Sequence, residues 1–177
     1  RLELWVKNRS DQAFQHFKSY DFCTSSGTLG PKREEGDRQI PEGMYHIDRF
    51  NPNSSYFLSL GLNYPNLSDK IRGHATHPGS DIFIHGNCVT VGCIPITDEW
   101  IRELYLLAET AKANGQSKIS VLLFPFEMTD QNQTTYARKN PEHRSFWEEL
   151  RPIYQFFEEH STVPDWEVDS QGHYQVF

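Results

Sequence analysis

Alternating apolar and polar positions at the start of the chain indicate β-structure. Apolar residues occupy every second position from Leu2 to Val6, among mostly polar neighbours, as is typical of a strand with one solvent-facing side. A second stretch repeats this period of two before a segment rich in Gly, Pro, Ser and charge. The pattern predicts strands over 2–6 and 14–22, a hairpin turn near 8–11, and a long loop over 23–43.

Later apolar runs predict more strands and two helices. Apolar residues recur at helical spacing from Trp100 to Ala111, behind Thr97 as a predicted N-cap, and this helix should end near Gly115. A second helix is predicted to begin at Asn140–Pro141 and to be kinked or split at Pro152. Strands are predicted over 44–50, 56–60 and 81–85, at a central position over 118–126, and as two short strands around 170–172. The fold class is therefore mainly β with two or three flanking helices (α+β).

Composition limits the number of domains and the classes of function. The 177 residues allow one well-buried core, so we expect a single domain over 1–177. A content of 37% hydrophobic, 14% aromatic and 23% charged residues is in the ordinary globular range. The net charge of -7, with scattered Lys and Arg, argues against nucleic-acid binding. No apolar run approaches the roughly 20 residues that span a bilayer, so no membrane span is expected.

Three cysteines without a C-x-x-C pair indicate neither a disulfide framework nor a thiolate zinc site, and one free thiol is the simplest expectation. Cys88 is either buried or, in an exported protein, paired with Cys23. The first residues lack the apolar stretch of a signal peptide. Because export removes that stretch, its absence here does not exclude export.

Candidate chemistry is concentrated in the segment DIFIHGNCVTVGCIPIT, residues 81–97. His85 ends a predicted buried strand, and its imidazole could take the proton of the Cys93 thiol. Gly92 removes the side chain before the cysteine, which leaves room for a substrate carbonyl and backbone N–H groups for an oxyanion. This set predicts a thiol nucleophile for acyl transfer.

Other interpretations of these residues stay open at this stage. Cys93 could be a small buried apolar residue, and His85 a core histidine bonded to a carbonyl. A metal site could use His74, His77, Asp81 and His85, although H-x-x-H lacks the helical spacing of H-E-x-x-H and exposed loop histidines are the ordinary alternative. The polar stretch 129–140 is predicted to be a solvated loop.

Motifs along most of the chain resemble one known family. IHGNCVTVGC resembles the His-Gly pair and S/T-x-G-C motif of the L,D-transpeptidase catalytic domain (YkuD fold), and Pro41, Gly43 and Tyr45 resemble its P-x-G-x-[FY] pattern. NPEHRSFWEELRPIYQFFE and the terminal GHYQVF resemble the YafK-like branch. Two positions depart from the broader pattern, since Val91 replaces a histidine and Pro95 an arginine, so neither role is carried over.

The resemblance implies a YkuD-like β-sandwich or barrel-like sheet and an enzyme of the bacterial cell envelope. Cys93 would attack a peptidoglycan stem peptide at meso-diaminopimelate and form a thioester, with His85 as base and then acid. Thr90 would either orient this base or stabilise the turn, and Gly92 would complete the catalytic set. Substrate contacts are expected from Gly86, Arg72 and Tyr45, with Lys32 and Lys70 as further countercharges. No cofactor or metal is expected.

Rival functions follow from the same comparison. A hydrolase of the family, either an L,D-carboxypeptidase or an amidase that releases a peptidoglycan-linked lipoprotein, would pass the thioester to water instead of an amine. A non-catalytic peptidoglycan-binding module would keep the fold without the chemistry. A periplasmic or cell-envelope location is expected for each of these peptidoglycan-directed functions.

Overall fold

The fold is built on a mixed five-stranded sheet, which we describe from a computed structural model of residues 1–177. Its strands are β3 (Gly43–Ser54), β4 (Phe57–Leu62), β5 (Phe83–His85), β6 (Ile94–Pro95) and β7 (Ser120–Leu123). Their order is β6-β5-β4-β3-β7, and all pairs are antiparallel except β5–β6. The long strand β3 pairs with β7 through its first residues and with β4 through the rest.

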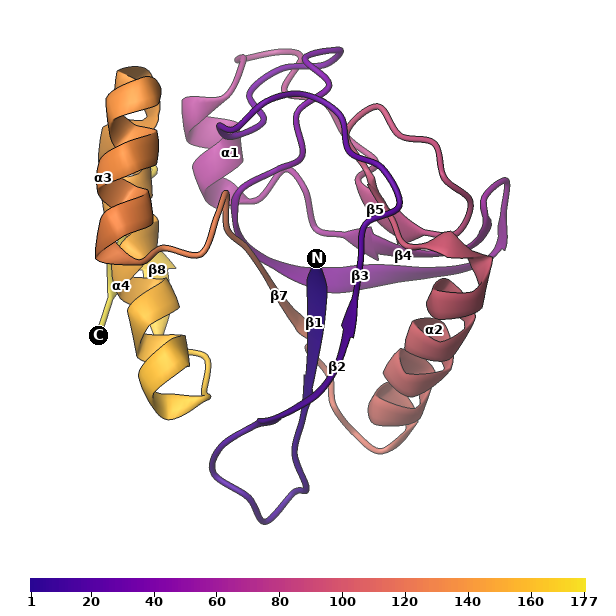
Figure 1. Cartoon of the computed structure of the whole chain (residues 1–177). Coiled ribbons are helices and arrows are strands. Elements are labelled where there is room, and N and C mark those ends of the chain that lie inside the picture. The colour runs from indigo at the N-terminus through magenta and orange to yellow at the C-terminus, as the bar shows by residue number, and fades with distance from the viewer.

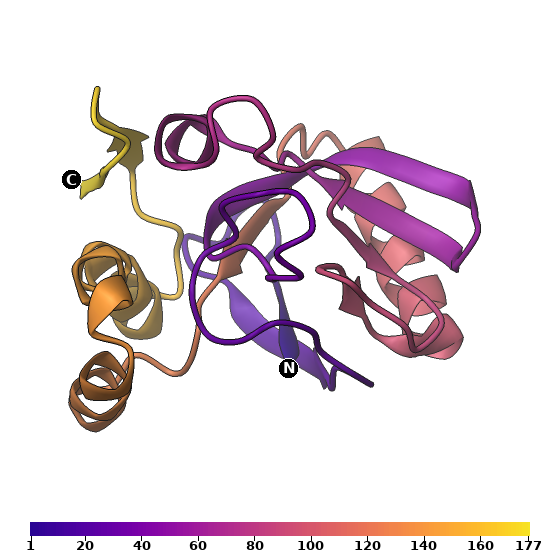
Figure 2. The same ribbon diagram turned by 90° about the horizontal axis from the view of Figure 1, so that it is seen from above.

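Helices lie on both sides of this sheet (Figures 1 and 2). Helix α2 lies on one side, and α3 and α4 lie together on the opposite side. The helices are α1 (Leu67–Arg72), α2 (Thr97–Ala113), α3 (Asp130–Lys139), a short 3-10 turn (Pro141–His143) and α4 (Arg144–His160). Two separate hairpins complete the fold, β1 (Leu2–Val6) with β2 (Gln15–Tyr20), and β8 (Trp166–Val168) with β9 (Tyr174–Val176). No helix has the length and apolar character needed to cross a membrane.

Two hydrophobic clusters hold these layers together. The first includes Ile84 and Ile101 and packs α2 against the sheet. The second includes Trp147 and Leu150 of α4, both fully buried. Adjacent residues of β3 divide between the clusters, with Met44 in the second and Tyr45 in the first, because successive side chains of a strand point to opposite faces.

The structure confirms the α+β class and most predicted elements. The N-terminal hairpin, the helix from Thr97, the helix that follows Pro141 and the C-terminal hairpin are all present. The prediction of a single domain over 1–177 stays a prediction.

Four expectations about the elements were wrong. Strand β7 is an edge strand that pairs only with β3, although its apolar run is typical of a central position. The stretch predicted as a solvated loop contains α3, which is capped by Thr129. Helix α4 continues through Pro152 as one element, so the predicted alternative of a split is wrong, and the alternative of a kink stays a prediction. Helix α2 begins at Thr97 with no side-chain cap, because Thr97 itself is the first helical residue.

Candidate active site

A cavity of about 250 Å³ lies over the β4–β5 part of the sheet. Its walls come from the hairpin between β3 and β4, from Asp81 and Phe83, and from His85 and Cys93. Cys93 is the one free cysteine of the chain. The two residues that sequence analysis singled out for chemistry therefore line the same pocket.

Strand register explains why they meet. In the parallel pair β5–β6, Ile84 lies opposite Ile94, and both are buried. Cys93, one residue before β6, therefore lies beside Phe83, and their side chains share the face of the sheet that His85 also occupies. Cys93 therefore lies two positions along β5 from His85, on the neighbouring segment. No hydrogen bond joins the His85 ring to the Cys93 sulfur.

Hydrogen bonding fixes the state of the His85 ring. Nδ1 lies 2.5 Å from the Gly86 carbonyl oxygen, which can only accept, so Nδ1 carries the proton and Nε2 keeps its lone pair. His85 is 1% exposed, and burial lowers the pKa of its imidazole below the ordinary value. The Tyr56 ring covers it, with ring centroids 4.7 Å apart. At neutral pH His85 is a neutral imidazole that can accept a proton.

The Cys93 thiol is neutral at rest as well. Its sulfur accepts from the Phe83 N–H at 3.4 Å and donates to the Asp81 carbonyl oxygen at 3.6 Å. Burial raises the pKa of the thiol, and the Phe83 N–H opposes this only in part. Attack by this sulfur therefore requires that a base remove its proton.

The turn before the nucleophile is held by Thr90. The Thr90 hydroxyl donates to the Cys93 carbonyl oxygen at 2.7 Å and accepts from the Gly92 N–H at 3.1 Å. Of the two roles that the resemblance allowed, these contacts match stabilisation of the turn. They also occupy the Gly92 N–H, which was expected to be free for an oxyanion. Gly92 has φ = +132°, and a Cβ there would lie 3.0 Å from the Gln39 carbonyl oxygen, so the turn requires glycine.

The three expected substrate contacts lie outside the cavity. Arg72 forms an ion pair with Glu149 at 2.7 Å, and Tyr45 is buried and donates to Asp69 at 2.8 Å. Gly86 is enclosed, since a Cβ there would lie 2.5 Å from Asp98 Oδ1. Each position has a structural explanation, and none of the three lines the pocket.

The two residues that depart from the common motif of the family lie close to Cys93 and opposite His85. Val91 is 74% exposed beside the nucleophile, and Pro95 is buried opposite His85 in the β5–β6 pair. A proline has no N–H to donate and no charge. Neither position supplies the polar group that the common motif has there.

Sequence reasoning missed the pocket residues of the β3–β4 hairpin. Asn51, Ser54, Tyr56 and Ser59 all line the cavity, and Ser59 lies opposite His85 across the β4–β5 pair. Polar Ser59 between apolar Leu58 and Leu60 is a period-two signal of a strand with one polar face. The signal was present, but nothing in one sequence connects this hairpin to His85.

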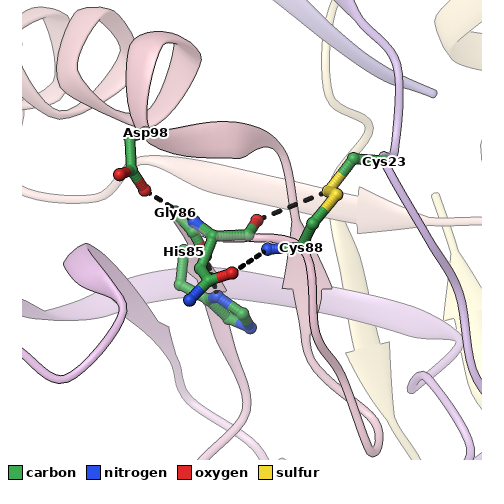
Figure 3. The surroundings of a disulfide bond; sticks show 6 residues. Cys23, His85, Gly86, Cys88 and Asp98 are labelled. Atoms are coloured by element: carbon green, nitrogen blue, oxygen red, sulfur yellow. Dashed lines mark hydrogen bonds between the residues drawn. A yellow bond between two sulfur atoms is a disulfide. The ribbon is translucent and has the colours of Figure 1, made fainter.

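A disulfide links the segment between His85 and Cys93 to the N-terminal part of the chain (Figure 3). Cys88 is bonded to Cys23, so the pairing that sequence left open is formed. The neighbouring Asn87 N–H donates to the Asp98 carboxylate at 2.7 Å. The segment from His85 to Cys88 is therefore fixed from α2 and from the loop after β2.

The histidines of the alternative metal site do not all come together in the fold. His74 and His77 stack on each other with ring centroids 5.6 Å apart, while His85 lies in the Cys93 pocket. No group of three or more His, Cys, Asp or Glu side chains is placed to hold a metal ion.

Comparison with known proteins assigns the chain to a family. Residues 2–121 match the sequence model of YkuD, the L,D-transpeptidase catalytic domain. The chain belongs to this family. It is therefore an L,D-transpeptidase-family catalytic domain, and the predicted membership is confirmed.

Two curated relatives are similar over nearly the whole chain. Proteins of Escherichia coli K12 and of Escherichia coli O157:H7, both named "Putative L,D-transpeptidase YafK", are 36% identical over 165 residues, which is 92% of this chain. The chain spans 64% of the length of these relatives. The resemblance to the YafK-like branch is thereby confirmed.

Among solved structures, the helical cell shape determining protein Pgp2 of Campylobacter jejuni is similar at 19% identity. The match has a TM-score of 0.49 and covers 94% of this chain and 68% of the Pgp2 chain. A K307A mutant of Pgp2 matches with the same TM-score and identity.

Proposed function

We propose that this domain is a cysteine acyl-transfer enzyme that acts on peptidoglycan stem peptides at meso-diaminopimelate. One observation carries the proposal: the only free thiol, Cys93, and a neutral imidazole, His85, line one pocket from the same face of adjacent strands. Membership of the L,D-transpeptidase family supplies the substrate class.

The mechanism follows from the resting state of the two groups. His85 Nε2 takes the thiol proton while the Cys93 sulfur forms a bond to the carbonyl carbon of meso-diaminopimelate. The Gly92 N–H is occupied by Thr90, so the Cys93 N–H is the remaining donor of the predicted pair for the oxyanion. The C–N bond to the next residue then breaks, His85 returns the proton to the leaving amine, and a thioester remains.

The second half of the reaction determines the product. An amine acceptor gives transfer, whereas water gives an L,D-carboxypeptidase or an amidase that releases a peptidoglycan-linked lipoprotein. Both routes share the Cys93 thioester. The Cys23–Cys88 disulfide supports a periplasmic or cell-envelope location, because disulfides persist in oxidising compartments.

The test is incubation of the purified protein with muropeptides and analysis of the products by mass spectrometry. We expect a covalent adduct on Cys93 that is absent from Cys93→Ala, together with 3-3 crosslinks or exchanged D-amino acids. Trimmed stems without crosslinks would assign the hydrolase instead. Equal turnover by the wild type and Cys93→Ala would refute Cys93 as nucleophile.

A non-catalytic peptidoglycan-binding module is the second candidate. The observation that favours it is the missing hydrogen bond between His85 and the Cys93 sulfur. Binding of stem peptides without any adduct on Cys93, under conditions where iodoacetamide alkylates that thiol, would select this candidate.

A further inference from the structure

A charged pair borders the Cys93 pocket and has no part in the mechanism above. Arg49 Nη1 donates to Asp81 Oδ1 at 2.8 Å, with the two side chains 43% and 65% exposed. Asp81 lines the pocket, and its carbonyl oxygen accepts from the Cys93 thiol. The Arg49 guanidinium lies over the ring of Phe83, 4.9 Å from its centroid, and Phe83 also lines the pocket. The pair is thus next to the reacting sulfur.

The sheet is built to let Arg49 reach this position. Arg49 starts on β3, opposite Gly61 of β4, and Gly61 in turn lies opposite Phe83 of β5. Its side chain therefore crosses a whole strand over Gly61. A Cβ at Gly61 would lie 2.9 Å from Arg49 Nε, so a side chain at this position would displace the arginine.

The other partner is held in an uncommon backbone conformation. Asp81 has φ = +57°, in the left-handed region that residues other than glycine seldom adopt. Strained positions of this kind concentrate at binding and active sites. The side chains of Arg49 and Ser80 both donate to the Asp81 carboxylate and lower its pKa, so it stays ionised.

Both groups retain hydrogen-bonding capacity. A guanidinium has five N–H donors, and Arg49 uses three, to Asp48, to Asp81 and, at 3.5 Å, to the Leu62 carbonyl. The Asp81 carboxylate accepts from two side chains and offers about four lone-pair positions. The pair can therefore bind a second pair of opposite charges without breaking its own contact.

We propose that Arg49 and Asp81 form a subsite for the zwitterionic end of the substrate side chain. A carboxylate and an ammonium on one carbon, as at the end of diaminopimelate, match this arrangement: the carboxylate binds Arg49 and the ammonium binds Asp81. This inference rests on the proposed function and deepens it. Stem peptides with lysine at this position lack the carboxylate and leave Arg49 without its ligand.

The experiment measures binding rather than turnover, with Cys93→Ala protein and two synthetic tetrapeptides that differ only in diaminopimelate or lysine. We expect calorimetry to show the diaminopimelate peptide bound at least about tenfold more tightly, as a charge-assisted bond to arginine allows. Arg49→Gln should make the affinities for the two peptides equal, so that their ratio falls to about one. Gly61→Ala should reduce it without removing a charge, and Asp81→Asn should weaken binding of both peptides.

The control is Arg144→Gln, which removes an arginine paired with Glu148 at 2.9 Å on α4. It should leave the ratio unchanged. Equal affinity for the two peptides, or a ratio that survives Arg49→Gln, would overturn the subsite. Because the adduct on Cys93 tests the acyl transfer separately, a failed ratio with an intact adduct rejects only the subsite.

Discussion

Removal of the Cys23–Cys88 disulfide should destabilise the protein chiefly through its unfolded state. The bond closes a loop of 65 residues, for which the chain-entropy relation gives about 4 kcal/mol of stabilisation at 25 °C. In a chain of 177 residues, a loss of that size lowers the melting temperature by roughly 8–16 °C. In the folded protein, the segment around Cys88 stays in place without the disulfide, since the Asn87 N–H still donates to the Asp98 carboxylate at 2.7 Å.

Urea unfolding of the wild type and of Cys23→Ser/Cys88→Ser measures this difference. Wild-type protein reduced with dithiothreitol is the matched control, and its unfolding curve in urea should coincide with that of the double variant. Below the unfolding transition, the double variant should still be alkylated at Cys93 at the wild-type rate, because the native pocket is retained. A free energy of unfolding within about 1 kcal/mol of the oxidised wild type would refute the reasoning.

Two further predictions concern ionisable groups. Tyr56→Ala should expose His85 and raise the pKa of its imidazole toward the ordinary value, so the acidic limb of the activity profile moves to higher pH. An NMR titration of the His85 ring measures this pKa. Tyr56→Phe keeps the aromatic ring and should leave the pKa of His85 unchanged. Burial raises the pKa of Glu42 to about 7. The folded state thus holds this proton more tightly, and the free energy of unfolding should fall by up to about 3 kcal/mol between pH 4.5 and 7. Urea titrations of Glu42→Gln should show a shallower fall, and an unchanged slope would contradict the assignment.

The elements that sequence predicted well are those with a strong periodic pattern. Helix α2 and the strand from Leu2 have apolar residues at one clear period, and α2 also has Thr97 and Gly115 as signals near its ends. Helix α3 lacked this signal because its residues are almost all polar, with only Gln133 and Ala137 buried. Its position depends on Phe126, which stacks on Tyr136 at 4.5 Å, a contact between elements that no local pattern encodes.

The candidate site was predictable only in part, for a related reason. His85 and Cys93 lie eight residues apart in one segment, so a motif can identify both. Tyr56 lines the same pocket from another hairpin, and Arg49 of that hairpin contacts Asp81 and Phe83 in the pocket wall. Arg72 was selected for charge alone, and charge does not reveal that Glu149 already neutralises it.

The C-terminal layer packs against the end of the sheet formed by the start of β3 and by β7. The family match ends at residue 121, inside β7, and the next residue, Leu122, packs into the second cluster with α4. Buried polar contacts join this layer to the residue before β3 and to the N-cap of α1, since the Trp147 indole donates to Glu42 at 2.8 Å and Asn66 donates to the Tyr174 hydroxyl at 2.8 Å. No residue after 121 lines the Cys93 pocket. The layer therefore contacts the site only indirectly, for example through β3, whose first residues it packs against and whose later residues carry Arg49 and lead into the hairpin that covers His85.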